Sequence, residues 1–365
     1  MYARLGEVET YFSTFALMNS VDYIIVGCGL AGISFCEVLK ANSKTFVVYD
    51  NASQQSSIVA AGLYNPVILK RFTEVWKAQA QLDIALPNYA KIETELGIEV
   101  DHQHPIYRRF SSIEEQNLWF TASDKPSLES FLSTDIKKNK NEHIDAPFGL
   151  GEVLHGGRID TAHLISVYKK DLISKNLLKE EQFDYDQLDF SQPELSYKHT
   201  IAKHIVFAEG YGVKKNPYFN HIPINGTKGE VLTIKATNLK LNTAVKSSIF
   251  IISIGNDLYK VGSTYKWKDK TNVPTKAAKE ELLLKLKKFI TCDFEVVGHQ
   301  AGIRPTVGDR RPIIGKHQNI DNLYVLNGLG SRGVMIGPYV AEKLFNLIEK
   351  DIQLDNEIDI NRFKK

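Results

Sequence analysis

The pattern of apolar positions predicts a strand, a turn and a helix near the beginning of the chain. A mostly apolar run from Val21 to Val26 leads directly into the glycine-rich segment GCGLAG at 27–32. Helical spacing of apolar residues follows over 31–40, and the β-branched and aromatic run TFVVYD at 45–50 reads as a second strand. Together these elements form a βαβ unit, which predicts an α/β fold with a parallel sheet.

The alternation of strands and helices lapses further along the chain and then returns. Residues 76–98 have helical spacing, whereas 99–150 read as mixed short strands and loops. Helical spacing returns within GGRIDTAHLISVYKKDLISKNLL at 156–178, and the strand HIVFAEG follows at 204–210. We interpret this as a return to the first α/β unit after an insertion.

The second half of the chain predicts an antiparallel sheet and a closing strand, turn and helix. The alternating segments VLTIKA, SSIFIISIG and LYKVGSTYKW lie between 219 and 268, and an amphipathic helix is expected over 275–290. The final segment, NLYVLNGLGSRGVMIGPYVAEKLFNLIEK at 322–350, is typical of the end of a nucleotide-binding domain.

This order of elements predicts two intertwined domains. With 365 residues the chain is long enough for two cores. The first is a split Rossmann-type domain over 21–76, 151–218 and 296–350, and the second is an antiparallel-sheet (α+β) substrate domain over 77–150 and 219–295. Residues 1–20 lack the pattern of the rest and are expected to be an extension outside the fold, with Met18 as an alternative start of translation.

Charge and cysteine content narrow the classes of partner. The 45 Lys and Arg residues are interspersed with 43 Asp and Glu residues, so no net field favours nucleic acid or a membrane surface. No apolar run approaches the ~20 residues that span a bilayer.

The cysteines Cys28, Cys36 and Cys292 form no CxxC pair, which is typical of the cytoplasm. His102 and His104 lack further spaced ligands, so no metal site is expected.

The glycine-rich turn has the spacing of a dinucleotide-binding motif. The first glycine permits the tight turn, the second lets the backbone approach a pyrophosphate, and the third allows close packing of helix on strand. The pyrophosphate would lie at the helix N-terminus, where unpaired N–H groups favour negative charge. An acid ending the next strand would accept hydrogen bonds from a ribose and repel a 2′-phosphate, which favours FAD or NAD over NADP. The cofactor-binding residues expected here are Gly27, Gly29, Leu30, Ala31, Gly32 and Asp50.

Three further segments make the chain similar to the D-amino-acid oxidase and glycine oxidase family of FAD-dependent enzymes. SSIVAAGLYNP at 56–66 resembles the second FAD-contacting loop of that family, and GGRIDTAHL at 156–164 resembles a segment that opens a helix of its FAD domain. AGIRPTVGDRRPIIG at 301–315, continuing into NLYVLNGLGSRGVMIGP, resembles the series of motifs before the last helix. The resemblance spans about 21–349 and implies FAD as the cofactor.

The resemblance also implies roles for individual residues. The arginine matching Arg304 binds the substrate carboxylate in that family, as a planar guanidinium can do with two parallel hydrogen bonds. Tyr265 is implied as a pocket wall or hydroxyl donor, and Arg332 as a substrate contact or a brace of its loop. A structural ion pair of Arg304 with Asp309, and plain packing of Tyr265, remain alternatives. The further cofactor contacts implied are Ser56, Ser57, Ala61, Gly62, Leu63, Gly328, Gly330, Ser331, Arg332, Gly333, Val334 and Met335.

The expected activity follows from these roles. The resemblance implies oxidation of a small amine-bearing carboxylate (a D-amino acid, glycine or an N-methyl amino acid) by hydride transfer to flavin N5, with oxygen or another acceptor reoxidising the flavin. AGIRPTVGD has no cysteine where monomeric sarcosine oxidases attach their flavin, so FAD is expected to be non-covalent. One alternative is a 2-hydroxy-acid dehydrogenase, which would need a histidine or other base near the flavin. His299 is close in sequence to Arg304, but a single histidine of this kind is usually structural. A second is an oxidoreductase that modifies a tRNA wobble uridine.

Overall fold

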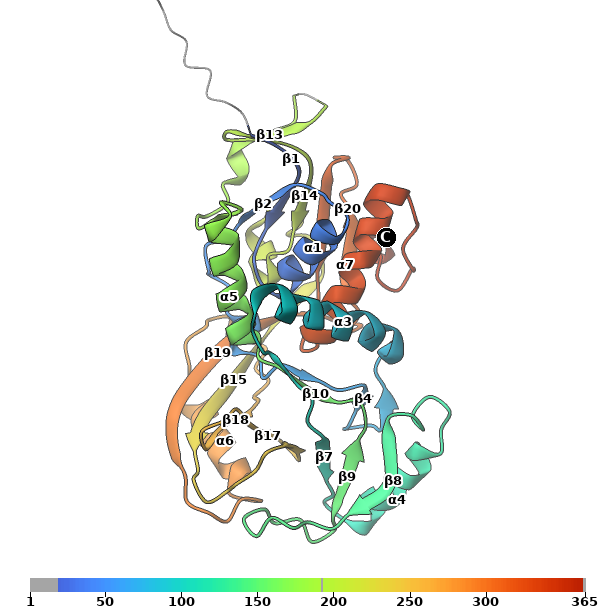
Figure 1. Cartoon of the computed structure of the whole chain (residues 1–365), viewed down its shortest axis with the longest axis vertical. Helices are drawn as coiled ribbons and strands as arrows, with labels where there is room; N and C mark the ends of the chain where they lie inside the picture. Colours follow the sequence, from blue (N-terminus) through green and yellow to red (C-terminus); the bar gives the residue numbers. More distant parts are fainter. Residues whose placement is uncertain (1–18, 192, 364–365) are drawn as a thin grey trace, which may run out of the picture.

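The structure, a computed structural model, describes residues 19–191 and 193–363 and contains two large sheets (Figure 1). The first has eight strands, in the order β11-β2-β1-β14-β13-β12, with β21 and β20 added beside β14. Neighbours among β11, β2, β1, β14 and β21 are parallel, whereas β12, β13 and β20 pair antiparallel. The strands are β1 Asn19–Val26, β2 Phe46–Tyr49, β11 Leu178–Lys179, β12 Leu188–Asp189, β13 Leu195–Tyr197, β14 Thr200–Phe207, β20 Ile313–Lys316 and β21 Leu323–Asn327.

Helices cover the first sheet because its central strand is apolar on both faces. In β1, Tyr23 and Ile25 belong to one core, whereas Ile24 and Val26 belong to another on the opposite face. Helix α7 packs on both α1 and α3 beside the first core. Their bounds, with that of α5, are α1 Leu30–Ala41, α3 Ala78–Leu96, α5 Thr161–Ser174 and α7 Gly333–Lys350. The predicted α/β class is confirmed.

The first strand begins earlier than the sequence pattern indicated. Asn19 and Ser20 already pair with Thr200 and Ile201 of β14, although the apolar run starts only at Val21. Both residues are exposed, so their pairing leaves no hydrophobic signal. The rest of the predicted extension, including the alternative start at Met18, lies outside the described residues.

The second sheet is the lower one in Figure 1 and also has eight strands, in the order β19-β15-β18-β17-β16-β7-β9-β8. All neighbours are antiparallel except β16 and β7. The strands are β7 Ile106–Arg109, β8 Leu132–Lys137, β9 Leu150–Val153, β15 Ile224–Lys235, β16 Ala244–Lys246, β17 Phe250–Ser253, β18 Leu258–Gly262 and β19 Glu295–Val307. Helix α6 Lys276–Leu286 covers one face and α4 Ile113–Ser123 lies beside β8.

Two expectations about these segments need correction. The sequence placed 296–350 with the nucleotide-binding domain, but β19 pairs with β15 along its length and so lies in the second sheet. A strand's own pattern does not reveal which distant strand it joins.

Residues 99–150 also hold the helix α4, whereas the sequence predicted only short strands and loops there. Ser112 caps it by accepting a hydrogen bond from the backbone N of Glu115, a pair that matches the S-x-x-E capping signal. The division into domains otherwise stays a prediction.

The two faces of the second sheet have different surroundings. Residues directly opposite one another on neighbouring strands point to the same face. Leu232, Val261 and Ile251 pack with α6 in one core, whereas Val231 and Phe250 point the other way and join the core shared with the first sheet. The face turned toward the first sheet therefore carries the residues considered below.

Short elements complete the fold. A small sheet joins β3 Leu63–Tyr64, β10 Gly157–Ile159 and β6 Asp101–His102, and β4 Val67–Ile68 pairs with β5 Thr73–Glu74. The one-turn helix α2 spans Ser56–Val59, and 3-10 turns occupy Tyr185–Gln187, Gly210–Lys215 and Ile360–Phe363. None of the helices in the described ranges is long and apolar enough to cross a membrane.

Candidate active site

The glycine-rich turn joins β1 to the N-terminus of α1. The helix begins at Leu30 with Gly29 as its N-cap, and the backbone N of Ile33 donates to the carbonyl oxygen of Gly29 at 2.9 Å. A Cβ atom on Gly32 would lie 2.0 Å from the carbonyl oxygen of Gly27, so only glycine lets the helix approach the turn this closely. The helix N-terminus has the N–H groups and dipole that favour a phosphate.

The second predicted cofactor loop is held against this turn. Ser57 Oγ accepts a hydrogen bond from the backbone N of Leu30 at 3.3 Å. The carbonyl oxygen of Ala60 accepts one from Lys260 Nζ at 3.0 Å, and that of Gly62 accepts one from the backbone N of Ile159 at 3.0 Å. The loop is thereby fixed between the turn of the first sheet and β18 of the second.

Asp50, after the end of β2, lies beside the turn as expected but has an unexpected partner. Its Oδ1 accepts a hydrogen bond from the backbone N of Cys28 at 3.2 Å, and its Oδ2 pairs with Lys169 Nζ from α5. A carboxylate oxygen can accept more than one hydrogen bond, so a ribose hydroxyl can still bind here. Because the lysine balances the charge, Asp50 discriminates less against a 2′-phosphate than the sequence indicated.

The third predicted loop, between β21 and α7, lies against β19. The backbone N of Gly330 donates to the carbonyl oxygen of Pro305 at 3.1 Å, which ties the loop to the residue after Arg304. Helix α7 begins at Gly333, whose Cβ position would lie 3.1 Å from Leu30 Cδ1 at the start of α1. The N-termini of α1 and α7 therefore lie in the same region. The loop residues expected to contact the cofactor, 328–335, are brought together with 27–32.

Arg304 is held rigidly on the face of the second sheet that is turned toward the first. Its Nη2 donates to Ser263 Oγ at 2.8 Å and its Nη1 to the carbonyl oxygen of Thr264 at 3.3 Å. The guanidinium lies 4.6 Å from the centre of the Tyr265 ring. A Cβ atom on Gly229 of β15 would lie 1.9 Å from Nη2, so the guanidinium occupies the space that glycine leaves free. Burial lowers the pKa of Arg304, and Tyr265 opposes this shift.

Arg304 has no carboxylate partner among the residues that the structure describes. The alternative of a structural ion pair required Asp309 as the partner of Arg304. The Asp309 carboxylate instead accepts a hydrogen bond from Arg362 Nε at 2.9 Å. A buried charge is unfavourable unless it is paired. The arrangement therefore disfavours the structural alternative and suits an anionic ligand.

Tyr265 and Arg332 lie close to Arg304. Burial lowers the pKa of Arg332, while Tyr265 opposes the shift and two neighbouring arginines add to it. Within the described ranges Arg332 makes no ion pair. Tyr265 as a whole residue is 56% exposed, so it does not serve as a core packing residue. The structure thus brings all three predicted catalytic residues into one region.

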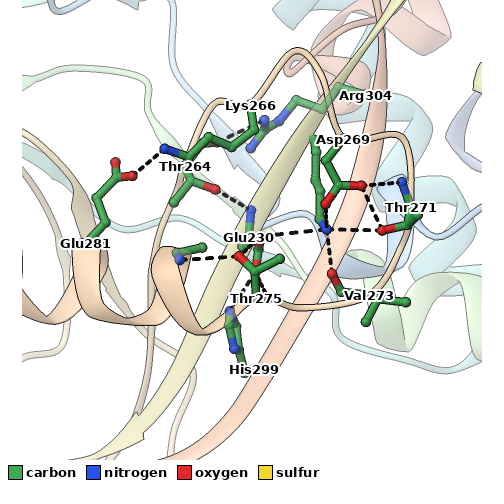
Figure 2. A network of polar contacts seen from close by, with 12 residues as sticks. Glu230, Thr264, Lys266, Asp269, Thr271, Val273, Thr275, Glu281, His299 and Arg304 are labelled. Atoms are coloured by element: carbon green, nitrogen blue, oxygen red, sulfur yellow. Dashed lines mark hydrogen bonds and ion pairs between the residues drawn. The ribbon is translucent and has the colours of Figure 1, made fainter.

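A polar network around Glu230, on the opposite face of the second sheet, holds Thr264, one of the two residues that accept hydrogen bonds from Arg304 (Figure 2). The backbone N of Glu230 donates to Thr264 Oγ1 at 3.0 Å, and the Glu230 carboxylate accepts from Thr275 N at 2.7 Å. His299 Nε2 lies 2.9 Å from Glu230 Oε2. Because His299 and Arg304 are five residues apart in β19, they point to opposite faces. His299 is therefore not placed to act as a base beside Arg304.

Two lysines that the sequence interpretation did not single out lie on the same face as Arg304. Lys260 alternates with Gly262 in β18 and holds the Ala60 loop. Lys246 in β16 is opposite Phe250 in β17. Lys260 interrupts a mainly apolar strand and Lys246 ends one, and a lysine within such an apolar segment is the signal that could have identified them.

Comparison with known proteins gives one family and several relatives. The DAO family, described as FAD dependent oxidoreductase, matches residues 22–347. The tRNA 5-methylaminomethyl-2-thiouridine biosynthesis bifunctional protein MnmC of Legionella pneumophila subsp. pneumophila is 28% identical over 185 residues, which are 42% of this chain and 28% of that protein. Glycine oxidase of Bacillus licheniformis is 27% identical over 154 residues, which are 40% of this chain and 41% of that protein. The matches thus span less than half of either relative.

Solved structures share the fold over nearly the whole chain. Glycine oxidase from Geobacillus kaustophilus superimposes with a TM-score of 0.73 at 18% identity, covering 93% of this chain and 97% of that one. L-proline dehydrogenase from P. horikoshii superimposes with a TM-score of 0.77 at 15% identity, covering 95% and 99%. At these identities the likeness concerns the fold alone.

Proposed function

Because this chain belongs to the DAO family of FAD-dependent oxidoreductases, we propose that it oxidises a small amine-bearing carboxylate at the carbon next to the nitrogen. The observation that carries the proposal is the guanidinium of Arg304, which Ser263 and Thr264 hold on the face turned toward the cofactor loops and which has no carboxylate partner among the described residues. A carboxylate matches the planar fork of a guanidinium in shape and charge.

The residues that would hold FAD are Asp50 and three segments that lie close together in the structure. The turn at 27–32 would bind the pyrophosphate, Asp50 the ribose, and the segments 56–63 and 328–335 the remainder. The close approach of Gly32 to Gly27 and the adjacent N-termini of α1 and α7 fit this anionic cofactor. When bound, FAD supplies the acceptor for the hydride that leaves the substrate carbon.

The side chains above the cofactor loops would orient the substrate. Arg304 would fix the carboxylate with two parallel hydrogen bonds and so limit rotation about the bond to the reacting carbon. Arg332 would add a second positive charge, and the exposed Tyr265 ring would form one wall of the pocket. Orientation is the main requirement on the protein, since the cofactor performs the difficult step.

The alternatives differ in how well they fit the site. A 2-hydroxy-acid dehydrogenase would need a base near the flavin, and His299 points to the other face of the sheet, beside Glu230. Similarity to the MnmC protein of Legionella favours a second candidate, an oxidoreductase acting on a modified uridine of tRNA. The proposed oxidation of an amine-bearing carboxylate and the modification of tRNA would use the same FAD-binding segments. Only a test of substrates therefore distinguishes these two functions.

Anaerobic bleaching of the flavin tests the proposed function. We expect members of a panel of D-amino acids, glycine and N-methyl amino acids to bleach the flavin absorbance, and the corresponding amines without a carboxylate to be much slower. Hydroxy acids and tRNA serve as the competing substrates. Bleaching by hydroxy acids, by tRNA alone or equally well by amines lacking the carboxylate would contradict the proposal. Admitting air afterwards tests whether oxygen serves as the acceptor.

We expect FAD to be bound without a covalent link. Burial raises the pKa of the Cys28 thiol to about 12 and that of Cys36 well above its usual range, so neither offers a thiolate. Cys292 packs against the core between α6 and the second sheet, on the face of the sheet opposite to Arg304. Acid precipitation should release intact FAD into the supernatant, where its absorbance identifies it. Flavin that stays with the precipitated protein would show a covalent link.

A further inference from the structure

We propose that the substrate carries a second carboxylate, which Lys246 binds while Arg304 holds the first, so that the enzyme acts on amino dicarboxylates. This inference rests on the proposed function, because Arg304 is assigned to the first carboxylate there. It adds a residue from a different strand and narrows the substrate class.

Lys246 and Arg304 project from the same face of the second sheet. Side chains of residues in register point to one face, and so do alternate residues along a strand. Arg304 lies four residues after Gln300 in β19, so the two share a face. The chain of registered pairs that joins this strand to Lys246 is Lys246–Phe250, Phe250–Gly262, Gly262–Val231 and Val231–Gln300.

Phe250, Gly262 and Ser263 link Lys246 to Arg304. Lys246 Nζ lies 5.2 Å from the centre of the Phe250 ring. A Cβ atom on Gly262 would lie 2.9 Å from Phe250 Cζ, and the next residue, Ser263, accepts the hydrogen bond from Arg304 Nη2. The Phe250 ring therefore lies between Lys246 and the anchor of Arg304. A ligand that reached both cations would carry its two carboxylates at opposite ends.

Lys246 has no anionic partner in the part of the chain that the structure describes. Burial lowers its pKa to about 8, and the nearby guanidinium groups of Arg108 and Arg304 contribute to the shift. Arg108 is itself paired with Glu115 and donates to the carbonyl oxygen of Ser247 at 2.9 Å. A carboxylate beside Lys246 would restore the charge balance of this region.

The two buried lysines of the second sheet among the described residues, Lys228 and Lys260, already have partners. Lys228 contacts Asp269 at 2.5 Å on the far face, and Lys260 donates to the carbonyl oxygen of Ala60 at 3.0 Å. Lys246 differs from both because its ammonium group has an aromatic ring beside it and no acceptor among the described residues. This difference singles it out as a ligand contact.

The test compares binding of dicarboxylates and a monocarboxylate to the oxidised holoenzyme. Malonate, succinate and acetate are titrated while the flavin absorbance is followed, which measures binding without turnover. We expect at least one dicarboxylate to bind roughly ten- to a hundredfold more tightly than acetate. The substitution Lys246→Met should remove most of this preference. The matched control is Lys276→Met at the start of α6, whose side chain is 91% exposed, and it should keep the preference.

A second measurement uses pH on the unmodified holoenzyme. Only the protonated lysine attracts a carboxylate, so the preference for the dicarboxylate should be present below pH 8 and decline above it. The charged groups that face Lys246 are Arg108 and Arg304, and Arg108 is paired with Glu115. A guanidinium does not lose its proton in proteins. Acetate binding should change much less. A preference that persists unchanged to high pH would contradict the assignment.

The outcomes separate this inference from the proposed function. Equal affinity for dicarboxylates and acetate, an unchanged preference in Lys246→Met, or loss of FAD from that variant would overturn the role of Lys246. If instead no amine-bearing carboxylate bleaches the flavin, the proposed function fails, and the titrations still report whether Lys246 binds a second carboxylate.

Discussion

Replacement of Arg304 by leucine is expected to raise the KM of the substrate roughly ten- to a hundredfold while FAD remains bound. A charge-assisted hydrogen bond contributes ~1.5–3 kcal/mol, and ~1.4 kcal/mol corresponds to a factor of ten. FAD should stay because the guanidinium contacts Ser263, Thr264 and Tyr265 and makes no hydrogen bond to the cofactor loops. Steady-state kinetics together with the flavin-to-protein absorbance ratio measure both quantities.

Two further variants distinguish binding from scaffolding at Arg304. Arg304→Lys should rescue KM only in part, since a point charge cannot reproduce a bidentate contact. Gly229→Ala would place a Cβ atom 1.9 Å from Nη2, so it should raise KM in the wild-type background but have little effect beside Arg304→Leu. Full activity of Arg304→Leu on the best substrate would make an uncharged amine the better candidate, and loss of FAD would make the residue part of the scaffold.

Substitution of Gly32 by alanine is expected to weaken FAD binding roughly ten- to a hundredfold. The new Cβ atom would lie 2.0 Å from the backbone oxygen of Gly27, so α1 or the turn must move. Overpacking of this kind costs ~1–3 kcal/mol. The same movement displaces the helix N-terminus from the pyrophosphate. FAD content after purification and reconstitution of the apoprotein with FAD give the change in affinity.

Gly308→Ala is the matched control for this prediction. A Cβ atom there would meet nothing within 4 Å, and the residue is exposed. It should retain FAD like the wild type. Undiminished FAD binding by Gly32→Ala would show that the turn does not hold the pyrophosphate.

The βαβ unit and its turn could be predicted from sequence because their signals are local. Apolar runs, the spacing of Gly27, Gly29 and Gly32, and Asp50 after the next strand all lie within about 30 residues. The helix α4 was equally local, through Ser112 and Glu115, and was missed although its capping signal is present.

The partners of the site residues depended instead on contacts between distant segments. The sequence alone determined the α/β class and the position of the glycine-rich turn, because these follow from short-range patterns of apolar residues and glycines. The Arg304 segment was singled out by its resemblance to a known family, and its role stays a prediction. The tertiary structure decided that β19 joins the second sheet, that Lys169 pairs with Asp50, and that Lys246 shares a face with Arg304. Strand register and long-range ion pairs join residues that lie far apart in the sequence, and Asp50 and Lys169 are 119 positions apart. No local pattern encodes such a choice, because many strands and charges of similar character compete for each partner.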